Sequence, residues 1–96
     1  MYYVYILKSL AYSAQLYIGY TKNLDQRLKT HNSGGSLHTA KYKPWEVIVC
    51  ISFKDEAAAI SFEKYLKTGS GRVFMEKFIA YAKKLCLAQP ALKVLI

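Results

Sequence analysis

The fold is decided by Tyr2-Tyr3-Val4-Tyr5-Ile6-Leu7 and Leu16-Tyr17-Ile18-Gly19-Tyr20, two stretches rich in aromatic and β-branched residues. Such residues favour strands, and only a short polar stretch around Ser9 to Gln15 separates the two. Neighbouring strands with so short a connection form an antiparallel hairpin. We expect Tyr5 to pair opposite Tyr17 and Tyr3 opposite Gly19, with all four residues on one face.

Helices and one further strand follow the hairpin. Asn23 is placed to cap a helix, with Gln26 as its capping-box partner, and this helix runs to about Thr30 or His31. A polar loop then leads to a third strand, 45–53 (Trp-Glu-Val-Ile-Val-Cys-Ile-Ser-Phe). Negative charge at Asp55 and Glu56 favours a second helix through about Lys67, and Gly69-Ser70-Gly71 breaks it.

A last helix is predicted over 73–84, which completes the order β-β-α-β-α-α. This order predicts an α+β fold: a small three-stranded antiparallel sheet flanked by helices. Residues 1–84 are expected to form the domain, and 85–96 an apolar tail with no assigned role. The tail is a candidate surface for a protein partner or for self-association.

Composition narrows the classes of function. Ninety-six residues with 53% hydrophobic content form one folded domain, and this content excludes a disordered chain. Fourteen Lys and Arg against six Asp and Glu give a net charge of +8, which favours nucleic acid first and an acidic membrane surface second. No apolar run approaches the roughly 20 residues that span a bilayer. Without a signal-peptide pattern or a CxxC pair, we expect a cytoplasmic protein with no disulfide framework and no zinc site.

Two groups of residues near the hairpin are candidates for chemistry. Glycine in a strand often marks the close approach of a ligand, so Gly19 beside Tyr5 and Tyr17 suggests a site. Taken alone, the tyrosines are better explained as ordinary strand formers and Gly19 as a bulge. On the next helix, Arg27 and His31 share the side that carries Leu24 and Leu28. Arg27 and His31 in this position could bind a phosphate, or they could equally be residues at the core whose polar groups are satisfied within the protein.

Two further groups lie in the second half of the chain. Glu63 falls at the border of an apolar helix stripe, where a carboxylate usually forms a rim salt bridge but can also hold a hard divalent cation. The basic turn from Lys67 to Arg72 contains two glycines before a predicted helix start. It is a weak candidate for phosphate binding, and the alternative is a turn between helices that happens to be basic.

In order and spacing these residues resemble the GIY-YIG nuclease domain. The first element corresponds to Tyr3-Val4-Tyr5 and the second to Tyr17-Ile18-Gly19, while the family's arginine and metal-binding glutamate match Arg27 and Glu63. Small stand-alone bacterial members are similar over further strings: Tyr17-Ile18-Gly19-Tyr20-Thr21, His31, His38-Thr39-Ala40, Pro44-Trp45 and Glu63-Lys64-Tyr65-Leu66-Lys67. Two positions depart from the pattern. Tyr3 replaces the first glycine, and Tyr20 lies where UvrC-like members have a lysine, whose role is unfilled or passes to Lys22 or His31.

The resemblance implies a metal-dependent endonuclease that hydrolyses phosphodiester bonds in DNA. One Mg²⁺ or Mn²⁺ would be held by Glu63, Tyr17 would help to take a proton from the attacking water, and Arg27 would clamp the phosphate. Tyr5 and His31 would position water or substrate. The expected nucleic-acid contacts are Lys22, Lys41, Lys43, Lys67 and Arg72. A catalytically idle nucleic-acid-binding module and a protein-interaction domain are the competing classes.

Overall fold

The computed structural model describes residues 1–88, in which three antiparallel strands form a single sheet. The strands are β1 (Tyr2–Ser9), β2 (Leu16–Thr21) and β3 (Trp45–Phe53), and their order in the sheet is β2-β1-β3. The helices are α1 (Leu24–Ser33), α2 (Glu56–Leu66) and α3 (Gly69–Ala88), with a short 3₁₀ helix, η1 (Ala40–Tyr42), before β3. The predicted fold class and the order β-β-α-β-α-α are confirmed, and η1 is an addition to them.

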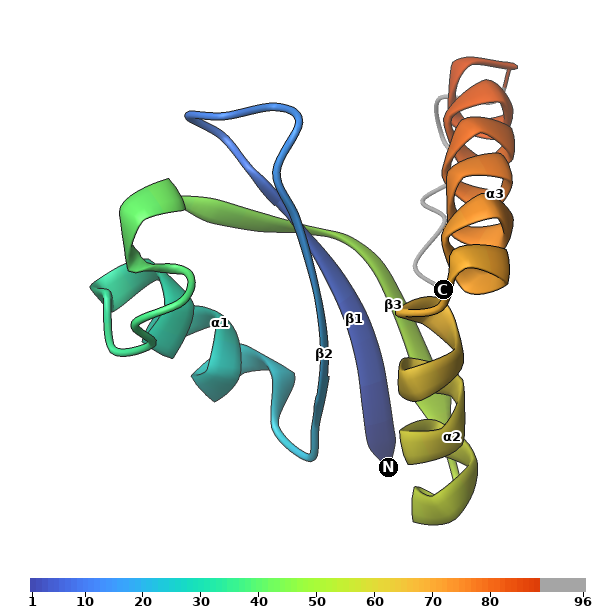
Figure 1. The fold of residues 1–96 in the computed structure, drawn as a ribbon, viewed down its shortest axis with the longest axis horizontal. Coiled ribbons are helices and arrows are strands. Elements are labelled where there is room, and N and C mark those ends of the chain that lie inside the picture. Colours follow the sequence, from blue (N-terminus) through green and yellow to red (C-terminus); the bar gives the residue numbers. More distant parts are fainter. Residues whose placement is uncertain (89–96) are drawn as a thin grey trace.

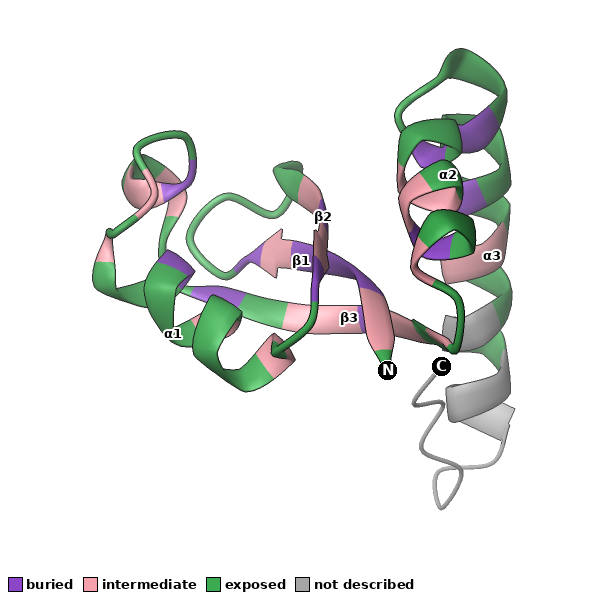
Figure 2. Ribbon diagram, turned by 90° about the horizontal axis from the view of Figure 1, so that it is seen from below, coloured by how far each residue is buried: buried purple, intermediate pink, exposed green. Residues whose placement is uncertain are grey.

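The central strand β1 is buried on both faces because helices cover the sheet from both sides. Figure 1 shows α1 on one side of the sheet and α2 and α3 on the other. Val4 and Ile6 belong to the core under α2 and α3, whereas Tyr5 and Leu7 belong to a second cluster with Trp45 under α1. The purple segment of β1 in Figure 2 marks this burial. A continuous apolar run is what a strand covered on both faces requires.

The predicted register of the hairpin is wrong by two residues. Tyr5 lies opposite Gly19, and Leu7 lies opposite Tyr17. The loop closes through the Ser9 backbone N–H, which donates to the Gln15 carbonyl at 3.1 Å, so that Lys8 pairs with Leu16. A shift of two preserves the side-chain alternation. Tyr5, Tyr17 and Gly19 therefore still share the face toward α1, as expected.

Helix α1 begins as predicted and ends two residues later. The Asn23 side chain accepts the Gln26 backbone N–H at 3.1 Å, but the reciprocal bond of a capping box is replaced, because the Asn23 N–H donates to Thr21 Oγ1. Gly34 ends the helix with a left-handed backbone, φ 80°. Only a residue without a side chain adopts that conformation at little cost.

Helix α2 ends at Leu66, about where predicted, but the glycines that follow it begin the next helix, so the predicted start at Val73 is wrong. Thr68 Oγ1 accepts the Gly71 N–H at 3.1 Å, and a Cβ on Gly71 would overlap the Tyr65 carbonyl. The missing side chain therefore lets α3 start directly against the end of α2. Helix α3 also passes the predicted end at Lys84. Residues 85–88 of the expected tail belong to this helix, and 89–96 lie outside the described residues.

No helix in the described part of the chain is both long and apolar enough to cross a membrane.

Two glycines of the same helical turn give a matched test of this packing. We expect Gly71→Ala to lower the free energy of unfolding by about 1–3 kcal/mol, because the added methyl group must displace the Tyr65 backbone. Gly69→Ala adds the same methyl group where nothing lies within 4 Å. It should raise the free energy of unfolding by less than about 1 kcal/mol, because alanine favours a helix more than glycine does. Urea unfolding followed by circular dichroism measures both. Equal effects of the two substitutions would contradict the packing argument.

Candidate active site

A buried chain of hydrogen bonds links β1, α1 and the loop before β3. The Tyr5 hydroxyl lies 3.0 Å from His31 Nε2, and His31 Nδ1 lies 2.8 Å from Thr39 Oγ1. Each of these three residues is 1% exposed. Tyr5 reaches His31 because its ring lies across Gly19, where a Cβ would overlap the ring. The strand glycine thus marks a close approach of a side chain from the same sheet.

Tyr17 packs against this chain from the edge strand β2. Its ring centroid is 4.7 Å from that of His31 and 6.2 Å from that of Tyr5. The side chain is half-buried, and within residues 1–88 its hydroxyl has no hydrogen-bond partner. The structure therefore brings Tyr5, Tyr17 and His31 together as predicted. The Tyr5 hydroxyl is hydrogen-bonded to the histidine, whereas the Tyr17 hydroxyl has no partner among the described side chains.

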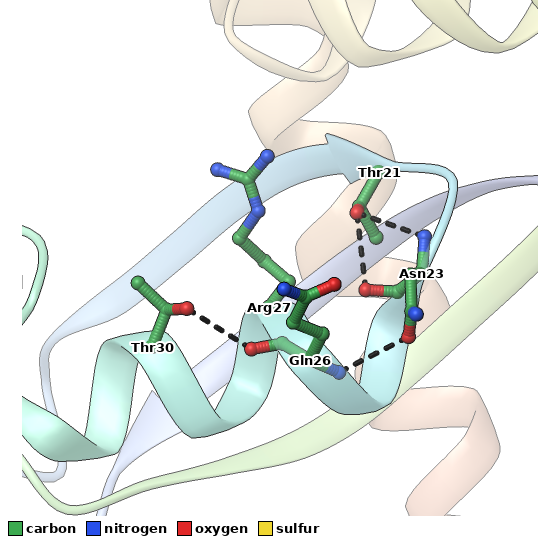
Figure 3. A pocket seen from close by; sticks show the side chains of 5 residues that line it. All are labelled: Thr21, Asn23, Gln26, Arg27 and Thr30. Atoms are coloured by element: carbon green, nitrogen blue, oxygen red, sulfur yellow. Dashed lines mark hydrogen bonds between the residues drawn. The ribbon is translucent and has the colours of Figure 1, made fainter.

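Arg27 lies on α1 one turn before His31 and is exposed. It lines a shallow pocket of about 230 Å³ together with Thr21, Asn23, Gln26 and Thr30 (Figure 3). None of the hydrogen bonds among these five side chains uses the Arg27 guanidinium. A guanidinium that lines a pocket, with donors unused by its neighbours there, is suited to bind a phosphate oxygen.

The charge states of Tyr5 and His31 agree with their hydrogen bond. Burial raises the pKa of the Tyr5 phenol, Tyr17 and the Glu63 carboxylate raise it further, and Arg27 opposes them. Burial also lowers the pKa of His31, with a second contribution from Arg27. Tyr5 is therefore protonated and His31 is neutral at neutral pH.

Glu63 lies on α2 and forms an ion pair. Its carboxylate bonds the Lys67 ammonium one turn further along α2, and 16% of the Glu63 side chain is exposed against 56% for Lys67. This is the rim salt bridge that the sequence suggested as one alternative. Glu63 still acts on the cluster, because its charge raises the pKa of Tyr5. Within the described chain no three His, Cys, Asp or Glu side chains come together as a metal cluster.

Tyr20 and Lys22 both contact Glu56 of α2. The Tyr20 hydroxyl donates to the Glu56 carboxylate on α2, which raises the pKa of Tyr20 to about 12 and lowers that of Glu56. Lys22 Nζ lies 3.6 Å from the same carboxylate. Neither side chain contacts the Tyr5 cluster in the described structure. Of the two residues suggested for the missing lysine role, only His31 lies in the cluster.

The other predicted contact residues are spread over two regions. Lys41 and Lys43 flank Tyr42 near η1, and the Lys41 ammonium is 5.1 Å from the Tyr42 ring centroid. Arg72 lies at the start of α3, in a hollow that it shares with Leu16 and Ile18 of the edge strand. In the turn before Arg72, the Gly71 N–H donates to Thr68 Oγ1, so this donor is not free for a phosphate.

Sequence reasoning missed three residues that hold the histidine in place. Asn32 binds the Trp45 backbone twice: its Nδ2 donates to the Trp45 carbonyl at 3.1 Å, and its Oδ1 accepts the Trp45 N–H at 2.5 Å. The Trp45 indole N–H donates to the Thr39 carbonyl at 3.0 Å. Thr39 and Trp45 stand in strings quoted for the resemblance, but no periodicity marks a loop residue as a partner of a helix.

The chain belongs to a class of catalytic domains. The family model of the GIY-YIG catalytic domain matches residues 1–77, and the chain belongs to this family. The GIY-YIG nuclease domain predicted from the sequence is thereby confirmed.

Two kinds of relative are similar to the chain. The structure-specific endonuclease subunit SLX1 of Chaetomium globosum is 41% identical over 69 residues, which are 66% of this chain and 21% of that protein. The chain thus spans about a fifth of the length of that relative. A UPF0213 protein of Clostridium perfringens is 41% identical over 68 residues, 70% of this chain and 71% of its own. The solution structure of a UPF0213 protein from Bacillus halodurans has a TM-score of 0.50 and 28% identity, covering 81% of this chain and 85% of that one.

The lowered pKa of buried His31 predicts a loss of stability in mild acid. Below the ordinary histidine pKa of about 6.5, the unfolded chain binds a proton that folded His31 resists, so the free energy of unfolding falls as pH decreases. Urea titrations between pH 7.5 and pH 5 measure this slope. His31→Gln should flatten it, and His38→Gln, which changes the exposed histidine, should leave it intact. Equal slopes in wild type and His31→Gln would show that the proton is bound elsewhere.

Proposed function

We propose that the domain is a metal-dependent endonuclease that hydrolyses phosphodiester bonds in DNA, with preference for branched or flapped structures. The observation that carries the proposal is the Tyr5–His31–Tyr17 cluster beside the free Arg27 guanidinium. The SLX1 relatives are structure-specific endonucleases by name, which supports the preference for DNA structure. A net charge of +8 supports a polyanionic substrate.

We propose different tasks for these residues. Arg27 would bind the scissile phosphate and stabilise the charge that grows on it. Tyr5 is held protonated against His31, so its lone pairs are available to orient water but its phenol is a poor base. Tyr17 is half-buried with an uncommitted hydroxyl, so it is the phenol that would help to take the proton from the attacking water.

Glu63 fits a single hard cation. One carboxylate is a sufficient protein ligand for Mg²⁺ or Mn²⁺ when water and phosphate oxygens complete the shell. The ion pair does not prevent this, because the more exposed Lys67 can turn into solvent. The cation, when bound, would stabilise the developing charge and the leaving oxygen.

A panel of nucleic acids tests the proposal directly. Purified protein is incubated with flapped, branched, single-stranded and plain duplex DNA and with RNA, in Mg²⁺, Mn²⁺ or EDTA. We expect cleavage of flapped or branched DNA that EDTA abolishes, and binding that weakens steeply with salt. Binding without cleavage of any substrate would instead support the nucleic-acid-binding module, the alternative that the Glu63–Lys67 ion pair favours.

Glu63→Gln is expected to abolish cleavage and leave the fold intact. The substitution preserves the shape of the side chain but removes the charge that would hold the cation. Calorimetric titration with Mn²⁺ should show that binding is lost, and circular dichroism should be unchanged. Glu46→Gln is the control, because it removes an exposed carboxylate on β3. A Glu63→Gln protein that binds Mn²⁺ and cuts normally would leave Glu63 as a rim residue only.

Tyr17→Phe separates the hydroxyl of Tyr17 from its ring. The ring contacts with His31 and Tyr5 remain, so the melting temperature should change little. If the hydroxyl takes part in proton transfer, single-turnover cleavage should fall by roughly 10²–10⁴-fold while substrate affinity remains near wild type. Full activity in this variant would exclude Tyr17 from the chemistry.

A further inference from the structure

We infer that Thr39 is a positioning residue: its hydroxyl fixes the tautomer of His31 so that the Nε2 atom accepts the proton of the Tyr5 hydroxyl. The inference rests on the proposed function for its catalytic consequence, but its structural part concerns only the protons within the buried chain.

The direction of the chain follows from which hydroxyl hydrogens find an acceptor. Thr39 Oγ1 has one hydrogen, which can be donated to the Ser36 carbonyl at 3.4 Å, an oxygen that also accepts the backbone N–H groups of Thr39 and Ala40. With that hydrogen directed at Ser36, the lone pairs of Oγ1 face His31 Nδ1 at 2.8 Å. A neutral imidazole has one N–H, so Nδ1 carries it and Nε2 is the acceptor. The hydroxyl of Tyr5, 3.0 Å from Nε2, is then the donor.

The opposite tautomer would change what Tyr5 can do. With the proton on Nε2, the ring would donate to the Tyr5 oxygen and the Thr39 hydroxyl would donate to Nδ1. The hydrogen of the buried Tyr5 hydroxyl would then have no acceptor among the described residues. In the inferred state both lone pairs of the Tyr5 oxygen stay free, and its hydrogen is fixed toward the histidine. A water molecule or a substrate oxygen that reaches the buried hydroxyl would meet Tyr5 as an oriented acceptor.

Thr39 can do this because its own position is fixed. Its backbone N–H donates to the Ser36 carbonyl at 3.2 Å, and its carbonyl accepts the Trp45 indole N–H at 3.0 Å. Trp45 is 4% exposed and is itself bound on both backbone groups by Asn32, the residue after His31. The helix that carries the histidine and the loop that carries its partner are therefore joined at two points.

The test reads the proton directly, without a substrate. Ring ¹H–¹⁵N correlation spectra of ¹⁵N-labelled protein distinguish a protonated Nδ1 from a protonated Nε2, and His38→Gln assigns the His31 signals. We expect protonated Nδ1 in wild type and in Thr39→Ser, which retains the hydroxyl. Thr39→Val retains the shape without the hydroxyl, and its spectrum should shift toward protonated Nε2. Cleavage should fall by about 10–100-fold in Thr39→Val and stay close to wild type in Thr39→Ser.

Each part of the inference can fail separately. A protonated Nε2 in wild type overturns it, and this spectrum does not depend on how Thr39→Val folds. Equal cleavage by the Ser and Val variants, measured well below their melting temperatures, overturns the catalytic consequence. A wild-type protein that cuts no nucleic acid defeats the proposed function instead, and the spectra then still decide the tautomer.

Discussion

The contact of the Tyr5 ring with the backbone of Gly19 is the constraint on which the site depends. A Cβ at Gly19 would overlap the ring, so a side chain there would push Tyr5 out of its buried position. The hydroxyl would then lose His31 Nε2, and His31 would lose its only link to β1 in the described hydrogen bonds. The same contact fixes the hairpin register, because Tyr5 lies directly opposite Gly19. The absence of a side chain at Gly19 is therefore required for the hairpin register, for the burial of Tyr5 and for the hydrogen bond between Tyr5 and His31.

The sandwich of helices explains why this contact is rigid. Val4 and Ile6 anchor β1 to the core under α2 and α3, and Tyr5 and Leu7 project to the other side, under α1. Packed interiors resist rotation of a strand, because every alternate side chain would lose its contacts. The scaffold of the sheet thus positions Tyr5, whereas α1 alone supplies Arg27 and His31. The Asn32 bonds to Trp45 connect the end of α1 to β3.

The sequence predicted the order of the strands and helices and the face of the sheet on which each side chain lies. It did not predict features that depend on contacts between residues far apart in the chain. Alternation placed Tyr5, Tyr17 and Gly19 on one face, but a register shifted by two residues gives the same faces, so pattern alone could not choose between them. The sequence predicted that the glycines at 69–71 only separate two helices. Their place at the start of α3 could not be predicted, because it depends on how closely Gly71 approaches the Tyr65 carbonyl of the preceding helix. Thr39 could not be inferred from periodicity, because its partners come from α1 and β3.

Arg27 and Glu63 act in opposite directions on Tyr5. Arg27 lowers the pKa of the phenol and Glu63 raises it, although burial outweighs both. A phosphate bound by Arg27 would offset its positive charge and make ionisation of Tyr5 still harder. Neutralisation of Glu63 by a cation would work the other way. Substrate and cation together would thus leave Tyr5 protonated as an oriented donor to His31, and the uncommitted hydroxyl of Tyr17 would remain the group free to exchange a proton with water.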